Sequence, residues 1–80
     1  MQVEVRLFAT LRSYLPATSD GVSARVEVPT GACIADVAGK LGIPPTLVHL
    51  VLVDGHAEAD RCRRLAEGSV LSIWPPIAGG

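Results

Sequence analysis

One helix pattern in an otherwise strand-rich chain limits the fold more than any other feature of the sequence. Four apolar residues recur at the helical spacing i, i+3, i+4 and i+7, and these are Ile34, Val37, Ala38 and Leu41. The pattern predicts one helix over residues 33–41, with Asp36 in the first turn, where a negative charge suits the helix dipole. Gly42 is placed to end this helix in a left-handed conformation, and Pro44-Pro45 prevents its continuation.

Strand patterns flank this helix on both sides. Apolar and polar residues alternate from Gln2 to Leu7, which is the period of a half-buried strand. Further strands are expected at 22–28, 50–53, 56–59 and 70–74, and a short helical turn at 10–15 with Leu11 and Leu15 inward. Asp54-Gly55 is a strong tight-turn signal between two of them. The first two strands are predicted to pair as an antiparallel hairpin.

Because one helix cannot cover both faces of a sheet, these elements predict an α+β roll. Its sheet is mixed, has four to five strands and has the helix packed across one face, and the β-grasp (ubiquitin-like) arrangement is the best-known example. Eighty residues are enough for one domain with a thin core. We expect residues 1–76 to form that domain and residues 77–80 to form a flexible C-terminal Gly-Gly tail.

Composition argues against several classes of function. A net charge of -1 gives no general attraction to nucleic acid or to an anionic membrane. No apolar run approaches the roughly 20 residues that span a bilayer, and no signal peptide is visible, so a cytoplasmic protein is expected. Cys33 and Cys62 lack the spacing of a zinc or redox pair, and His49 and His56 lack that of a metal site. With no phosphate loop or catalytic triad, we expect neither an autonomous enzyme nor a permanently bound cofactor.

The last six residues combine properties that suit one kind of chemistry. Pro75-Pro76 cannot donate ladder hydrogen bonds, so they end the final strand and favour an extended chain. Ile77 and Ala78 form a short spacer, and Gly79-Gly80 present almost no side chain. Such a tail fits a narrow channel and offers a carboxylate at its tip. Adenylation by ATP would make that carboxylate a mixed anhydride, which a sulfur nucleophile could convert to a thiocarboxylate.

The chain resembles the MoaD/ThiS family of ubiquitin-like sulfur carriers over nearly its whole length. Four segments support the resemblance: Phe8-Ala9-Thr10-Leu11-Arg12, Val53-Asp54-Gly55, the approach to the last strand at 65–68, and the end from Pro75 to Gly80. The first segment and the double proline resemble the small subunit of molybdopterin synthase more than the carrier of the thiamine pathway.

This resemblance implies a set of partners and a reaction. It implies a ubiquitin-activating-type enzyme that uses ATP, a sulfur donor protein, and loading of sulfur at Gly80 beside Gly79. In the molybdopterin branch, the tail then enters the large subunit of the synthase, and in the thiamine branch the partner is thiazole synthase. ATP is a substrate of the activating enzyme, so the carrier itself needs no cofactor.

Alternation along the strands also predicts a partner-binding face. If Val3, Val5 and Leu7 point to the core, Phe8 lies on the opposite face, and Trp74 does so by the same argument. The first and last strands are neighbours in a β-grasp sheet, so the two aromatic residues are expected to form one exposed apolar patch beside the tail, which Leu50 joins. We therefore assign partner binding to Phe8, Leu50, Trp74, Pro75, Pro76, Ile77 and Ala78.

Other functions remain open at this point. The same carrier chemistry serves thiazole, cysteine or tRNA thiolation. A ubiquitin-like modifier would instead join Gly80 to lysines of target proteins, and a simple interaction module would not use its tail. The run Arg61-Cys62-Arg63-Arg64 is expected to be a solvated face or to meet an acidic partner.

Overall fold

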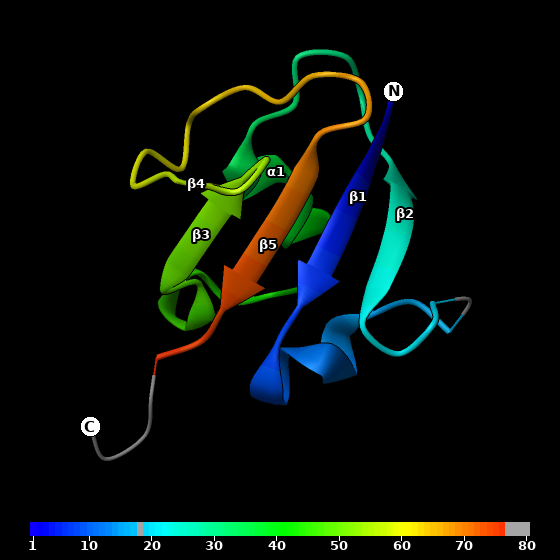
Figure 1. Ribbon diagram of the computed structural model, residues 1–80, viewed down its shortest axis with the longest axis vertical. Helices are drawn as coiled ribbons and strands as arrows, with labels where there is room; N and C mark the ends of the chain where they lie inside the picture. Colours follow the sequence, from blue (N-terminus) through cyan, green and yellow to red (C-terminus); the bar gives the residue numbers. More distant parts are fainter. Residues whose placement is uncertain (18, 77–80) are drawn as a thin grey trace.

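The computed structural model describes residues 1–17 and 19–76, and the predicted tail residues Ile77, Ala78, Gly79 and Gly80 lie outside them. Five strands form one sheet in the order β2-β1-β5-β3-β4 (Figure 1). The strands are β1 (Gln2–Leu7), β2 (Ser23–Glu27), β3 (Leu50–Val53), β4 (His56–Ala57) and β5 (Val70–Trp74). β1 and β5 lie side by side and are parallel, whereas the other neighbouring pairs are antiparallel. The predicted α+β roll with a mixed β-grasp sheet is confirmed.

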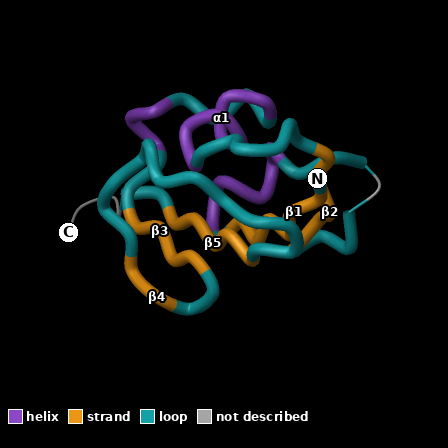
Figure 2. The backbone as a smooth tube through the Cα atoms, turned by 90° about the horizontal axis from the view of Figure 1, so that it is seen from above, coloured by secondary structure: helices purple, strands orange, loops and turns teal. Residues whose placement is uncertain are grey.

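The main helix, α1 (Ile34–Lys40), covers one face of this sheet (Figure 2). The core between them is made by fully buried apolar side chains: Val3, Val5, Leu7, Leu11, Ile34, Val37, Val51, Leu71 and Ile73. The backbone N–H of Cys33 donates to the carboxylate of Asp36 (2.9 Å), which satisfies one free donor at the helix start. Gly42 ends the helix with φ at +79°, as the sequence predicted.

Two short 3₁₀ helices complete the helical side, η1 (Ala9–Tyr14) and η2 (Pro45–Leu47). The first matches the turn predicted at 10–15, although Leu11 is fully buried and Leu15 only half-buried. The second was not predicted; Pro45 stands at its first position, where a missing N–H does no harm. No helix within residues 1–17 and 19–76 is long and apolar enough to cross a membrane.

Strand ends are where the sequence prediction was wrong. β2 begins one residue later than the predicted 22–28, because Asp20 accepts the N–H groups of Val22 and Ser23 and holds the chain in a turn there, and it ends one residue earlier, at Glu27. β4 stops at Ala57 instead of residue 59. The predicted tight turn before it is confirmed, with positive φ at Asp54 (50°) and Gly55 (85°).

Candidate functional site

Phe8 and Trp74 form a stacked aromatic pair at one edge of the sheet. β1 and β5 are parallel, so they end at the same edge, and the N–H of Phe8 donates to the carbonyl of Ile73 (3.2 Å). The two ring centroids are 4.2 Å apart and the planes differ by 3°. Both side chains are half-buried and lie on the face that α1 does not cover. The predicted proximity of these two residues is confirmed, but their side chains are half-buried and not exposed as predicted.

The residue after Phe8 has a strained backbone conformation. Ala9 has φ at +53°, a left-handed value that side-chain-bearing residues rarely adopt. The bend turns the chain from β1 into η1 and leaves Phe8 at the strand end, where it stacks on Trp74. Backbone strain of this kind is often found at functional sites.

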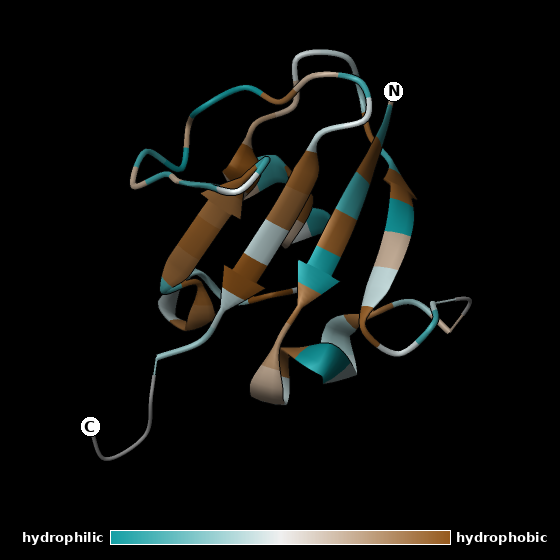
Figure 3. Ribbon diagram, in the orientation of Figure 1, coloured by the Kyte–Doolittle hydropathy of each residue, from teal (hydrophilic) through white to brown (hydrophobic). Residues whose placement is uncertain are grey.

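Leucines of β3 extend the aromatic pair into a wider apolar patch. Leu50 is the register partner of Trp74 and is 43% exposed. Leu52, two residues on, shares that face and is half-buried. We call Phe8, Leu50, Leu52 and Trp74 the open-face patch. Leu52 was missed from the sequence because β3 is apolar throughout, which hides the alternation that is visible along β1 (Figure 3).

Polar residues border the open-face patch. On β1, Arg6 Nε lies 2.6 Å from Glu4 Oε2, and Ser72 is half-buried on β5 between Val70 and Trp74. An exposed ion pair of this kind contributes little to stability. An apolar centre with a polar rim is the usual composition of a protein-binding surface.

The chain leaves the sheet beside the open-face patch. Pro75 and Pro76 follow Trp74 directly, and they are half-buried and exposed, respectively. The N–H of His49 donates to the carbonyl of Trp74 (3.0 Å), and this is the last ladder bond of β5, since the prolines have no N–H. The site residues predicted from Ile77 to Gly80 remain predictions, because they lie outside the described residues.

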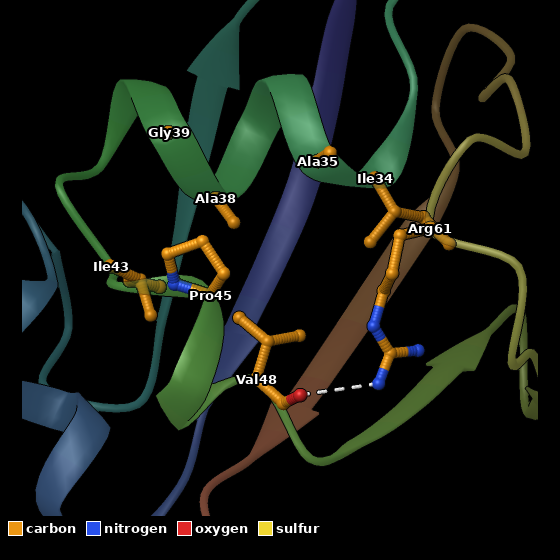
Figure 4. A pocket seen from close by; sticks show the side chains of 8 residues that line it. All are labelled: Ile34, Ala35, Ala38, Gly39, Ile43, Pro45, Val48 and Arg61. Atoms are coloured by element: carbon orange, nitrogen blue, oxygen red, sulfur yellow. Dashed lines mark hydrogen bonds between the residues drawn. The ribbon is translucent and has the colours of Figure 1, made fainter.

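A concave surface lies on the helix side, between α1 and η2. It is a groove of about 180 Å³, lined mainly by apolar side chains from both elements and closed at one end by Arg61 (Figure 4). The Arg61 guanidinium donates to four backbone carbonyls: Val48 (3.2 Å), His49 (2.8 Å), Glu58 (3.0 Å) and Ala59 (3.4 Å). The prediction of a solvated arginine run is therefore wrong for Arg61, which is half-buried and fastens the 58–61 loop to the start of β3.

Titratable groups of the described residues show no metal centre. Within residues 1–17 and 19–76, no group of three or more His, Cys, Asp or Glu side chains is arranged to hold a metal ion. Cys62 is exposed, and its backbone N–H donates to the carboxylate of Asp60. Cys33 is half-buried and directly precedes α1. The pKa of Asp36 is lowered by the hydrogen bond that Cys33 N–H donates to its carboxylate. Its role is structural, because it caps α1.

Comparison with known proteins places the chain in a family. The family model described as Mut7-C ubiquitin matches residues 1–78. The chain belongs to the Mut7-C ubiquitin family. The prediction of a ubiquitin-like family member is confirmed. No curated protein matches the chain.

Solved structures give this Mut7-C ubiquitin protein relatives of two kinds. SAMP1 from Haloferax volcanii is 28% identical, with 100% of both chains covered and a TM-score of 0.71. A second structure of that organism's small archaeal modifier protein 1 is 30% identical over 95% of this chain and 98% of that one, with a TM-score of 0.69. One chain from the complex of subunits 1 and 2 of the molybdopterin-converting factor from Helicobacter pylori is 21% identical. The match covers 100% of this chain and 100% of that chain, with a TM-score of 0.63. That last likeness concerns the fold alone.

Proposed function

We propose that this protein is a sulfur carrier whose Gly80 carboxylate is adenylated and converted to a thiocarboxylate, and that it donates this sulfur in molybdopterin synthesis. The observation that supports this most is the open-face patch at the end of β5, where the chain passes directly into Pro75-Pro76. The patch binds the partner, and the segment beyond the prolines extends to the partner's active site. The proposal requires Gly80 to bear the free carboxylate of the mature protein.

The chemistry needs a partner for every catalytic step. A carboxylate oxygen of Gly80 attacks the α-phosphorus of ATP, and pyrophosphate leaves. A sulfide-equivalent nucleophile then attacks the carbonyl carbon, AMP leaves, and the thiocarboxylate remains. A ubiquitin-activating-type enzyme binds ATP, and a sulfur donor protein supplies the sulfide. The carrier contributes a docking surface and a glycine end, whose missing side chain leaves the carbonyl unhindered.

The acceptor is assigned from the sequence. Phe8-Ala9-Thr10-Leu11-Arg12 and the double proline favour the large subunit of molybdopterin synthase as the partner that takes the sulfur. The Helicobacter pylori relative is a complex of subunits 1 and 2, which is the kind of partnership proposed here. Thiazole synthase or another thiolation enzyme would use the same carrier chemistry.

A protein modifier is the second candidate. The two Haloferax volcanii structures of SAMP1, at 28% and 30% identity, favour it. A modifier uses the same adenylate, but an amine of a target protein replaces the sulfur nucleophile. The product is then an isopeptide at Gly80, and the two functions differ only after activation.

Intact mass spectrometry separates these possibilities. The purified chain is incubated with ATP, sulfide and an extract that contains the native activating enzyme, beside a variant that lacks Gly80. The carrier proposal expects one oxygen of the full-length chain to be replaced by sulfur, with no change in the variant. The untreated mass also establishes whether Gly80 is the last residue. An unchanged mass, when the same extract loads another carrier, would overturn the proposal, and adducts with other proteins would identify the modifier.

A further inference from the structure

The sequence contains one lysine, Lys40, so it offers few amines to an activated carboxylate. Arginine side chains are not acyl acceptors, because their guanidinium groups stay protonated. Among the described residues, the other amine is the α-amine of Met1. If Gly80 of one copy is joined to another copy, the surroundings of these two nitrogens decide where.

The Met1 amine lies one residue beyond the end of the β1–β2 ladder, whose last register pair is Gln2 with Glu27. It donates to the carbonyl of Val28 (2.7 Å), and the N–H of Val28 donates back to the carbonyl of Met1 (2.8 Å). The carboxylate of Glu27 lies 3.8 Å from the same nitrogen, and the Met1 side chain is 7% exposed. Attack by this amine on an acyl group would require it to give up its hydrogen bond to the Val28 carbonyl, which belongs to a reciprocal backbone pair.

Lys40 is in a different situation. It is the last residue of α1 and is exposed, and its Nζ makes one hydrogen bond, to the carbonyl of Glu27. A lysine ammonium stands on a flexible four-carbon stem. Rotation of that stem releases the hydrogen bond to Glu27 without disturbing the backbone. Lys40 is thus the accessible amine among the described residues.

Lys40 also lies at the far end of the sheet from the open-face patch. Glu27, which it contacts, is the register partner of Gln2 at the start of β1, whereas Leu7 at the end of β1 pairs with Ile73. Trp74 and Pro75 therefore leave the sheet at one edge, and Lys40 lies at the opposite edge. A protein attached to Lys40 would not cover Phe8 or Trp74.

We propose that Lys40 is the one site at which a second copy of this chain is attached through its Gly80. This inference rests on the modifier candidate described above. The Lys40 ammonium first loses a proton, and its nitrogen then attacks the carbonyl of a Gly80 adenylate. The C–N bond forms, the C–O bond to phosphate breaks, and AMP leaves. The product is a chain of copies joined by one kind of linkage, and a copy attached at Lys40 leaves the open-face patch of the copy that carries this lysine uncovered.

Peptide mass spectrometry tests this assignment. The chain is incubated with ATP and the extract, and species larger than one copy are isolated and digested with trypsin. Because trypsin cuts after Arg64 and Arg25 but not after a modified lysine, we expect one branched peptide, residues 65–80 attached at Lys40 within residues 26–61. The K40R variant keeps the positive charge and the donor to Glu27, and we expect it to form no species with two copies, while adducts with other proteins persist.

The outcomes distinguish this inference from the function it rests on. A branch at Met1, or two-copy species that persist in K40R, would overturn the Lys40 assignment alone, as would adducts with other proteins and no branch at all. If Gly80 takes up sulfur but no adduct of any kind forms, the modifier candidate and the Lys40 assignment both fail, and the carrier proposal stands. If Gly80 is never loaded, the proposed function fails first.

A chemical measurement checks the structural premise without any enzyme. In an unfolded chain, a free α-amine reacts faster than a lysine with an acetylating reagent at neutral pH, because α-amines are ordinarily the less basic group. In the folded protein we expect the order to reverse, with Lys40 acetylated before Met1. Faster acetylation of Met1 under folding conditions would remove the basis of the assignment.

Discussion

The two faces of the sheet are built from the same strands but differ in what they contact. Along β5, Ile73 is fully buried against the core, whereas its neighbour Trp74 lies on the other face, stacked on Phe8. Along β3, Val51 is buried and Leu50 is exposed. Because successive side chains of a strand point to opposite faces, one short segment supplies both kinds of residue.

Under the proposed function, the covered face serves folding and the open face serves binding. The covered face gains its free energy within the domain, from apolar area removed from water against α1. The open face has no such partner within residues 1–17 and 19–76, and its apolar area becomes fully buried only when another protein covers it. Substitutions on the two faces should therefore change different measured quantities.

The largest expected effect on stability is that of a substitution on the covered face. Ile73→Ala removes buried methyl groups and leaves a cavity that the sheet and helix cannot close, so we expect a loss of about 2–5 kcal/mol in the free energy of unfolding. Urea denaturation followed by circular dichroism measures it. Ile73→Val is the matched control, with an expected loss of about 0.5–1.5 kcal/mol. A loss under about 1 kcal/mol for the alanine variant would mean that the two faces do not differ as described.

The largest expected effect on binding is that of the adjacent residue. Trp74→Ala removes the stack with Phe8, worth about 0.5–1.5 kcal/mol, so the protein should stay folded. A central aromatic residue of an interface typically contributes about 2 kcal/mol or more, so we expect affinity for the activating enzyme to fall roughly 30-fold. Titration calorimetry measures that affinity.

A matched variant locates this loss on the surface. Leu50→Ala, across the strand pair, should lower affinity less than Trp74→Ala does, because it is the smaller side chain. Unchanged affinity in both variants would remove the open-face patch from the proposed function.

Alternation made the main features of both faces predictable. In β1, regular alternation placed Val3, Val5 and Leu7 inward and Phe8 outward, and neighbouring first and last strands then brought Phe8 to Trp74. β3 lacks that signal, so Leu52 was missed. Alternation and helical spacing are local properties, and they predict the elements that depend on local patterns.

Long-range contacts of single polar residues were not predictable in this way. Arg61 donates hydrogen bonds to backbone carbonyls that lie 12 and 13 positions away in the sequence, and no spacing rule predicts these contacts. The chemistry of the tail was predicted in a third way, because the role of residues 77–80 was inferred from their composition and from the family resemblance.

The Arg61 contacts give a prediction of intermediate size that links the two faces. Arg61→Lys leaves a single ammonium where a planar guanidinium served four carbonyls, so we expect a loss of about 1–3 kcal/mol in stability. The N–H of His49, which bonds to Trp74, should then exchange faster with deuterium than in the native chain. Arg63→Lys is the control, since Arg63 makes one surface ion pair with Glu58 and should change stability little.

Unchanged exchange at His49 in the Arg61→Lys variant would show that the start of β3 is fixed without this arginine. In that case the affinity of the open-face patch should also be unaffected. If exchange rises and affinity falls together, Arg61 positions Leu50 and Trp74 from the helix side.

The smallest expected effect concerns pH and the helix that covers the inner face. The pKa of Asp36 is lowered below its ordinary 3.8 by the hydrogen bond from Cys33 N–H. A carboxylate with a depressed folded-state pKa stabilises the protein fully above its unfolded pKa, and this contribution is lost as the pH falls through the folded pKa. We therefore expect Asp36→Asn to be less stable than the native chain near neutral pH, and the difference to vanish as the pH falls below 3.8.

Asp20, whose pKa is lowered by the N–H groups of Ser23 and Val22, gives the matched variant Asp20→Asn. The two carboxylates share no partner, so their effects should add. Urea denaturation at a series of pH values measures both, and a difference for Asp36→Asn that persists at low pH would mean that this carboxylate does not stabilise α1 through its charge.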